Sequence, residues 1–169
     1  LVMSAGQASD LAWEDGAALD AYWSIAAAKS GAFFALACRA GAMLGVESEA
    51  ETVCYERFGA HFGMLLQVSD DLRALWRPRG RGDLLTLGRT LPVVYARAVA
   101  PPEMQARLRD LVARVPDDAA ALAEVQALLK DPELLGTHVP SVLHYVTLRA
   151  GIHYQKARAA LRATSRRDV

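Results

Sequence analysis

The chain lacks several features that would place it in large protein classes. Its 169 residues include only two cysteines, Cys38 and Cys54, and both stand in apolar surroundings. We therefore expect packed free thiols in a reducing cytoplasm rather than a disulfide. Lysine plus arginine number 19, and so do aspartate plus glutamate, which leaves no net charge. A neutral chain has no overall field to attract nucleic acid or an anionic membrane, which argues against both partners.

Long apolar runs and strand signals are also scarce. The stretch nearest to a membrane span, residues 25–44, is interrupted by Lys29 and Arg39, and a span needs ~20 unbroken apolar residues. No secretory signal is recognisable. No Asn-Gly or Asp-Gly turn separates alternating strand patterns, whereas the helix formers alanine and leucine dominate. The sequence therefore predicts an all-α protein without a membrane span.

Proline and glycine divide the chain into predicted helices. Asp20 is expected to cap the second helix and Gly45 to end it, and Gly59 or Gly63 is expected to kink the third. The chain begins LVMSAGQASD, without an initiator methionine and within a helical pattern, so we expect a fragment of a longer protein. The predicted helices cover residues 1–11, 21–44, 47–75, 91–100, 103–115, 117–130 and 139–163.

The segment LLQVSDDLRALW, residues 65–76, carries two carboxylates where a helix should be packing. On a helix Gln67 shares a face with Asp70 and Asp71, at spacings of three and four. We expect all three side chains to point into the bundle. Adjacent buried carboxylates need a cation, and hard oxygen ligands beside a phosphate favour Mg²⁺. A solvent-facing turn is the alternative, and the pair by itself fits that alternative better.

Two weaker signals precede this segment. Lys29 is the only charge in AYWSIAAAKSGAFFALAC, residues 21–38, where it either reaches solvent or projects into a cleft and binds an anion. Both possibilities stay open. Gln7 and Asp10 in GQASD are three apart and share a helical face, for which a capping or surface role is the simpler interpretation.

A basic loop follows the paired carboxylates. Arg77, Arg79 and Arg81 alternate with proline and glycine in RPRGRG. Guanidinium groups on a mobile loop suit a phosphate that must be covered and released, although a solvated loop or a nonspecific polyanion contact is the alternative. Together, the carboxylates, the lone lysine and the basic loop indicate a binding site for a diphosphate ester. The apolar tail of that substrate would lie between helices.

The order of these motifs resembles that of the trans-isoprenyl diphosphate synthases, or polyprenyl synthetases. That family has G-Q-x-x-D, K-T, F-Q-x-x-D-D-x-x-D and G-K-x-T-L-P in this order. The resemblance runs from Leu1 to about Ala100, with matching spacings between motifs. The matching segments are Gly6-Gln7-Ala8-Ser9-Asp10, Lys29-Ser30, Gln67-Val68-Ser69-Asp70-Asp71, Asp83-Leu84 and Thr90-Leu91-Pro92.

The resemblance implies a fold and a reaction. The family fold is an all-α bundle around a central cavity, usually in a homodimer. Its members join isopentenyl diphosphate to an allylic diphosphate. Mg²⁺ ions held by two aspartate-rich motifs assist departure of the allylic diphosphate, and the isopentenyl double bond attacks the resulting carbocation.

The resemblance also assigns roles to residues of this chain. Asp70 and Asp71 would hold Mg²⁺. Lys29 would bind the allylic diphosphate as a catalytic residue. Gln67 and Gln7 would take catalytic positions near the cation. Asp10 would be the acidic end of the G-Q-x-x-D motif. Arg79 or Arg81 would take the place of a flap lysine.

Four departures separate this chain from the family pattern. Ala74 replaces the third aspartate of the second motif, Leu66 replaces a phenylalanine, and Gly88-Arg89 stands about one place off G-K-x. The first D-D-x-x-D motif, which lies upstream of G-Q-x-x-D in the family, is absent. We therefore expect residues 1–169 to be the C-terminal part of one polyprenyl synthetase domain, completed by the missing N-terminal half.

Two other interpretations remain open. Ala74 is compatible with a class I terpene cyclase on the same fold, in which the cation closes on its own tail. The missing metal ligands are compatible with a non-catalytic subunit of a heteromeric prenyl diphosphate synthase, although such a subunit has no reason to retain buried charge.

Without the first aspartate-rich motif, the chain should be inactive by itself. We expect no product when it is mixed with Mg²⁺, isopentenyl diphosphate and an allylic diphosphate and the extract is analysed by mass spectrometry. A longer prenyl diphosphate formed by these residues alone would contradict the missing-half hypothesis, and a hydrocarbon with free pyrophosphate would indicate a cyclase.

Overall fold

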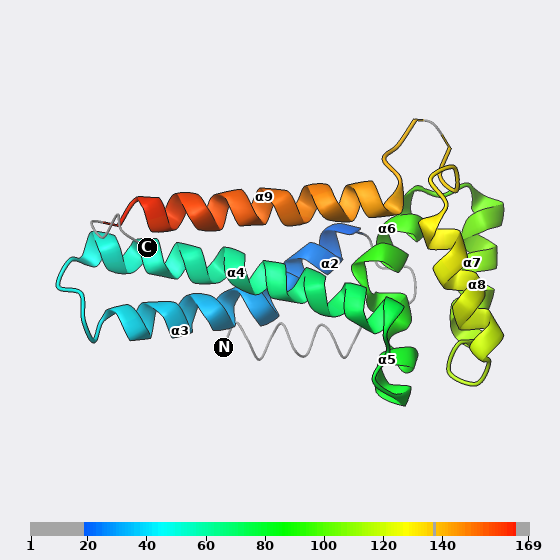
Figure 1. Ribbon diagram of the computed structural model, residues 1–169, viewed down its shortest axis with the longest axis horizontal. Coiled ribbons are helices and arrows are strands. Elements are labelled where there is room, and N and C mark those ends of the chain that lie inside the picture. Colours follow the sequence, from blue (N-terminus) through cyan, green and yellow to red (C-terminus); the bar gives the residue numbers. More distant parts are fainter. Residues whose placement is uncertain (1–18, 137, 165–169) are drawn as a thin grey trace. The chain divides into compact units, whose positions relative to one another are not determined.

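The computed structural model describes residues 19–136 and 138–164 (Figure 1). Their regular structure is entirely helical, which confirms the all-α prediction. None of these helices is long and apolar enough to cross a membrane. The elements are α2 (Leu19–Ala26), the π-helical η1 (Ala27–Gly31), α3 (Ala32–Ala42), α4 (Glu49–Trp76), α5 (Arg81–Leu85), the 3-10 turn η2 (Leu87–Arg89), α6 (Leu91–Val99), α7 (Pro102–Arg114), α8 (Ala119–Lys130) and α9 (Val142–Arg162).

Most predicted helices are found within three residues of their expected ends, but the one expected over residues 21–44 differs in three ways. Asp20 lies in the first turn of α2 instead of capping it. The helical run is interrupted by the π-helical turn η1. It ends at Ala42, three residues before Gly45. The helix predicted over residues 1–11 lies outside the described residues.

The described residues fall into two compact units. The first unit comprises residues 23–67 and 149–164, and the second comprises residues 19–22 and 68–148. Helices α2, α4 and α9 each contribute residues to both units.

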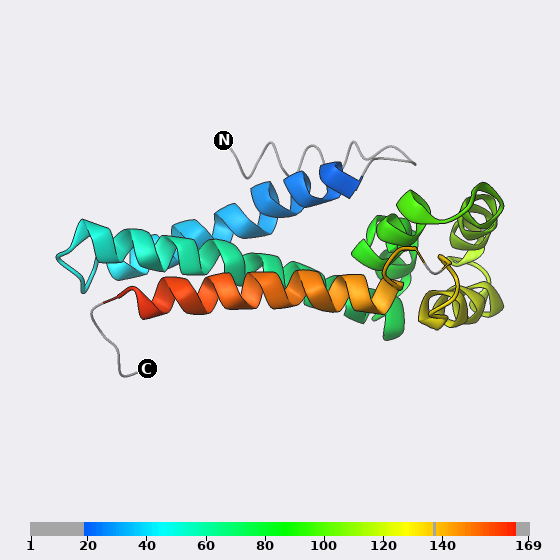
Figure 2. The same ribbon diagram turned by 90° about the horizontal axis from the view of Figure 1, so that it is seen from above.

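In the first unit, two glycines allow α3 and α4 to approach closely. A Cβ added at Gly59 would lie 2.2 Å from the Phe34 carbonyl oxygen, and one at Gly63 would lie 2.4 Å from the Ser30 carbonyl oxygen. Both glycines are buried on the face of α4 that meets the preceding helix. Close backbone contact, which only glycine permits, is therefore their structural role. The first-unit part of α9 runs alongside α4 (Figures 1 and 2).

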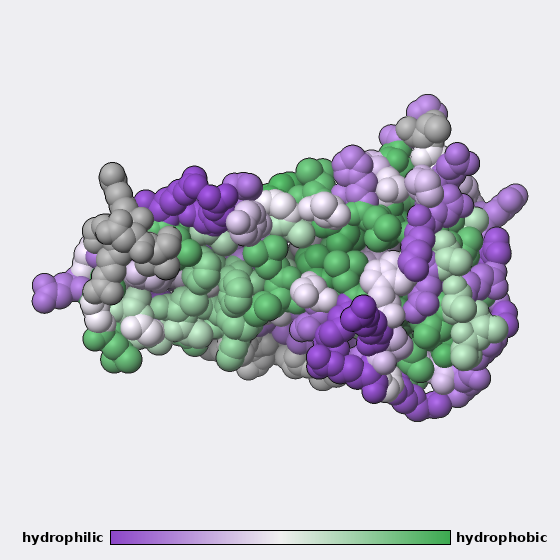
Figure 3. All heavy atoms as spheres, viewed as in Figure 1, coloured by the Kyte–Doolittle hydropathy of each residue, from purple (hydrophilic) through white to green (hydrophobic). Residues whose placement is uncertain are grey.

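The first unit also exposes large apolar side chains on α3 and just after it. Figure 3 shows hydrophobic residues spread over the face that carries α3 and α4. Contiguous exposed apolar surface commonly marks an interaction site. The exposed side chains are Phe33, Leu36, Met43 and Leu44, with exposed fractions of 48, 62, 64 and 91 %.

The core of the second unit is built around α6, where all residues from Leu91 to Ala96 are buried. Helix α7 packs against both α6 and α8. The rings of Tyr95 and Tyr145 stack with centroids 3.8 Å apart, and the Tyr95 hydroxyl donates to the Pro140 carbonyl oxygen at 2.8 Å. This ring pair joins α6 to the start of α9.

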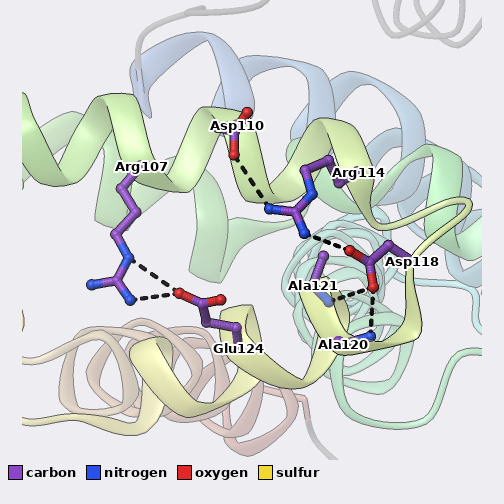
Figure 4. A network of polar contacts seen from close by, with 7 residues as sticks. All are labelled: Arg107, Asp110, Arg114, Asp118, Ala120, Ala121 and Glu124. Carbon is purple, nitrogen blue, oxygen red and sulfur yellow. Dashed lines mark hydrogen bonds and ion pairs between the residues drawn. The ribbon is translucent and has the colours of Figure 1, made fainter.

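Charged side chains connect α7 to α8 on the surface (Figure 4). Asp118 caps α8 by accepting from the backbone N–H groups of Ala120 and Ala121, at 2.9 and 3.2 Å. The Arg114 guanidinium also binds Asp118, and it holds the pKa of that carboxyl below its usual value. Arg107 forms a second ion pair, with Glu124. The cap explains why α8 begins at Ala119, two residues after the predicted start.

Replacing Gly59 by alanine should destabilise the protein, because the new Cβ would collide with the Phe34 backbone and force α3 and α4 apart. Overpacking of this kind costs about 1–3 kcal/mol, which urea denaturation should detect. Gly41→Ala is the matched control, since no atom lies within 4 Å of a Cβ there. The control should be neutral or stabilising through helix propensity. Equal stability of the two variants would contradict the close-contact role of Gly59.

Candidate functional site

Lys29 lies within the π-helical turn η1 of the first unit. It and the following Ser30 are half-buried. A π-turn accommodates one extra residue in a helix and changes the direction of the side chains within it, and such turns are frequent at functional sites. The sequence predicted an uninterrupted helix here, so this local distortion was not foreseen.

A hydrogen bond joins the Lys29-Ser30 segment to Gln67. The Ser30 hydroxyl donates to Gln67 Oε1 at 2.7 Å, across 37 residues of sequence. The contact is partly buried, and Gly63 lies one turn before Gln67 on α4, where it allows the Ser30 backbone to approach. Two of the predicted motifs are therefore brought together in the first unit, with the side-chain oxygen of Gln67 fixed by a serine hydroxyl.

Asp70 and Asp71, in the second unit, point in different directions. The Asp70 side chain is 66 % exposed, and it accepts from Arg73 at 2.9 Å in an (i, i+3) ion pair. The prediction that Asp70 points into the bundle is therefore wrong. Consecutive residues of an α-helix are ~100° apart around its axis, so one of two adjacent aspartates readily faces solvent while the other faces the core.

The Asp71 side chain is the one that faces the core, with only 7 % of the residue exposed. Its Oδ2 accepts from the Tyr22 hydroxyl at 2.7 Å and from the backbone N–H of Leu91, also at 2.7 Å. Burial, and after it the negative charge of Asp71, raises the pKa of the Tyr22 phenol far above its ordinary value. Tyr22 is therefore a permanent donor to this carboxylate.

The arginines of the basic loop are held by contacts within the second unit. The Arg79 backbone N–H donates to Asp83 Oδ2 at 2.8 Å, and the residue is exposed. Arg81 begins α5 and pairs with Asp117 at 2.9 Å, in the turn between α7 and α8. Both arginines remain accessible to an anion. Gln7 and Asp10 lie outside the described residues.

The two aspartates differ in how well they suit Mg²⁺. This ion binds through one or two carboxylates together with substrate phosphates and keeps several waters, so its ligand must be accessible. Asp70 fits that requirement, since only one surface arginine competes for it. Oδ2 of Asp71 does not fit, because it already accepts two hydrogen bonds away from water. Across residues 19–136 and 138–164, no group of three or more potential ligands among His, Cys, Asp and Glu could hold a metal ion.

The sequence interpretation missed a cluster of rings and cations in the first unit. Nδ1 of His61 on α4 and Nδ1 of His153 on α9 are 3.3 Å apart, within hydrogen-bond reach. Trp23 stacks on His153, and the Arg149 guanidinium lies 4.1 Å from the Trp23 ring centre. The histidines are 92 residues apart in sequence, so no local pattern could have paired them.

Burial lowers the pKa of both histidines. For His153 the neighbouring His61, Arg149 and Lys156 add to the effect, and its pKa falls from 6.5 to about 4. For His61, Lys156 adds to the effect of burial. Both rings are therefore neutral near pH 7, which allows one ring to donate a hydrogen bond to the other.

The chain matches the family model described as polyprenyl synthetase over residues 1–129. It belongs to the polyprenyl synthetase family. This result confirms the resemblance inferred from the motifs, all of which lie within the matched residues. Polyprenyl synthetases transfer prenyl groups in isoprenoid biosynthesis and in general use Mg²⁺. Comparison with curated proteins and with solved structures found no match.

The histidine pair predicts how the stability of this polyprenyl synthetase chain changes with pH. The unfolded chain binds protons to His153 near pH 6.5, but the folded chain does so only near pH 4, so acid favours unfolding. The free energy of unfolding should therefore decrease as the pH falls from about 6.5 to about 4. Urea denaturation at several pH values measures it.

His153→Gln should flatten this part of the profile, whatever its effect at pH 7. The exposed His144 provides the control, and His144→Gln should keep the parent slope. An unchanged slope in His153→Gln would exclude the histidine pair as the cause.

Proposed function

We propose that this chain is the C-terminal part of a prenyltransferase domain that condenses isopentenyl diphosphate with an allylic diphosphate. The observation that carries the proposal is the family match over residues 1–129, because it includes every motif from Gln7 to Thr90-Leu91-Pro92.

The proposed roles follow the accessibility of each group. Asp70 offers an exposed carboxylate to Mg²⁺, which when bound supplies Lewis-acid assistance to the leaving diphosphate. Lys29 binds the allylic diphosphate, and Arg79 or Arg81 covers it from the basic loop. The Gln67 side chain, oriented by Ser30, lies near the developing cation. Gln7 and Asp10 complete the proposed site.

The same proposal includes a homodimer in the cytoplasm. The exposed apolar side chains on and after α3 support an apolar contact with a second copy, because such surface is costly to leave in water. Cys38 and Cys54 are both free, as predicted, which supports a reducing compartment.

The test is binding of inorganic pyrophosphate, measured by isothermal titration calorimetry with and without Mg²⁺. We expect binding heat that depends on Mg²⁺, since Asp70 would hold the ion and the ion would supply positive charge to the anion. Asp70→Asn and Lys29→Met should each weaken binding about tenfold or more, because each removes a charged contact. Parent chain that binds no pyrophosphate in the presence of Mg²⁺ would overturn the proposal.

Asp110→Asn is the matched control for Asp70→Asn. Asp110 is also an exposed helical aspartate of the second unit that pairs with an arginine, Arg114, on its own helix. Its replacement should leave pyrophosphate binding unchanged. Equal losses in the two variants would show that general surface charge, rather than Asp70, determines the affinity.

A further inference from the structure

The Asp71 carboxylate of the second unit is buried and accepts from donors far apart in the sequence. A single oxygen, Oδ2, accepts from Tyr22 on α2 and from the backbone of Leu91, the first residue of α6. The donors come from 49 residues before and 20 residues after Asp71 in the sequence. One carboxylate on α4 therefore connects three helical segments.

Helix α6 depends on this acceptor because it has no side-chain cap of its own. Thr90 stands at the N-cap position, but its hydroxyl donates to the Leu87 carbonyl oxygen at 2.7 Å. Pro92 has no N–H, and Leu91 is fully buried, so its N–H cannot turn to water. Asp71 supplies the missing acceptor, and its negative charge suits the positive end of the helix dipole.

Tyr22 depends on the same carboxylate. The residue is only 5 % exposed, and a buried phenol hydroxyl requires a hydrogen-bond acceptor. Loss of Asp71 would leave the Leu91 N–H without this acceptor and would remove the carboxylate to which the Tyr22 hydroxyl donates. An unsatisfied buried donor is more costly than the hydrogen bond itself.

The contact with Leu91 also closes a loop. Residues 72–90, between Asp71 and α6, include the basic loop with Arg77, Arg79 and Arg81. A bond between the two ends of this segment limits the positions that its arginines can reach. The carboxylate therefore fixes the base of the segment that the proposed function places over a diphosphate.

We infer that the adjacent aspartates have separate roles: Asp71 is a positioning residue that ties α2 and the start of α6 to α4, and Asp70 is the one of the pair that would hold Mg²⁺. This inference rests on the proposed function for the role of Asp70. The resemblance implied that both residues hold Mg²⁺. In this inference only the accessible Asp70 would be a ligand, and the buried Asp71 holds the helices together.

The closing experiment measures thermal unfolding and Mg²⁺-dependent pyrophosphate binding for the full chain and three variants. Asp71→Asn retains one oxygen that can accept both hydrogen bonds, so its melting temperature should fall by no more than about 4 °C, and binding should remain within about threefold. Asp71→Ala should lower the melting temperature by roughly 5–10 °C. Asp70→Asn should melt within about 2 °C of the parent but weaken binding about tenfold or more.

A double-mutant cycle with Tyr22→Phe separates the anchor from a general packing effect. Tyr22→Phe should destabilise the parent but have a smaller effect in Asp71→Ala, because the hydrogen bond is already lost. Additive effects of the two substitutions would overturn the inference.

The remaining outcomes separate this inference from the proposed function. If Asp71→Asn abolished binding without altering the melting temperature, Asp71 would be a ligand and the inference would fail. If the parent bound no pyrophosphate, the proposed function and the role of Asp70 would fail, while the order of melting temperatures would still decide the role of Asp71.

Discussion

The buried negative charge of Asp71 determines how the second unit is organised around it. Removing a carboxylate from solvent is costly unless hydrogen bonds compensate, and Asp71 receives those bonds from a phenol and from the start of a buried helix. The requirement is mutual, because Tyr22 and Leu91 are buried as well. The positions of α6 and of the basic loop before it follow from this one arrangement.

The composition and the placement of proline predicted the helices well, because these signals are local. Pro92, Pro102 and Pro132 stand at or near helix boundaries, where a missing N–H is tolerated, and the intervening segments are rich in alanine and leucine. The order of the motifs also identified the family, since polar residues in apolar helices are rare enough to be informative. Both successes depend on residue types and their spacing along the chain, which the sequence contains directly.

The remaining features depend on contacts that no local pattern contains. Asp70 and Asp71 are chemically identical neighbours, and only the packing of α2 and α6 decides which of them is buried. The sequence suggested Gly59 or Gly63 only as a place for a kink in α4, because their close approach to the backbone of the preceding helical segment depends on a contact across the unit. The pairing of His61 with His153 likewise requires knowledge of which helices are neighbours.

The π-helical turn that contains Lys29 has a geometric consequence for the first unit. Trp23 and Phe34 are eleven residues apart, and in a straight α-helix they would lie on nearly the same side, about three turns apart. One additional residue in the turn between them offsets their azimuths by about a quarter of a revolution. The π-helical turn can thus direct Trp23 towards α9 and Phe34 towards α4, so that one continuous helical segment contacts two neighbours without a loop.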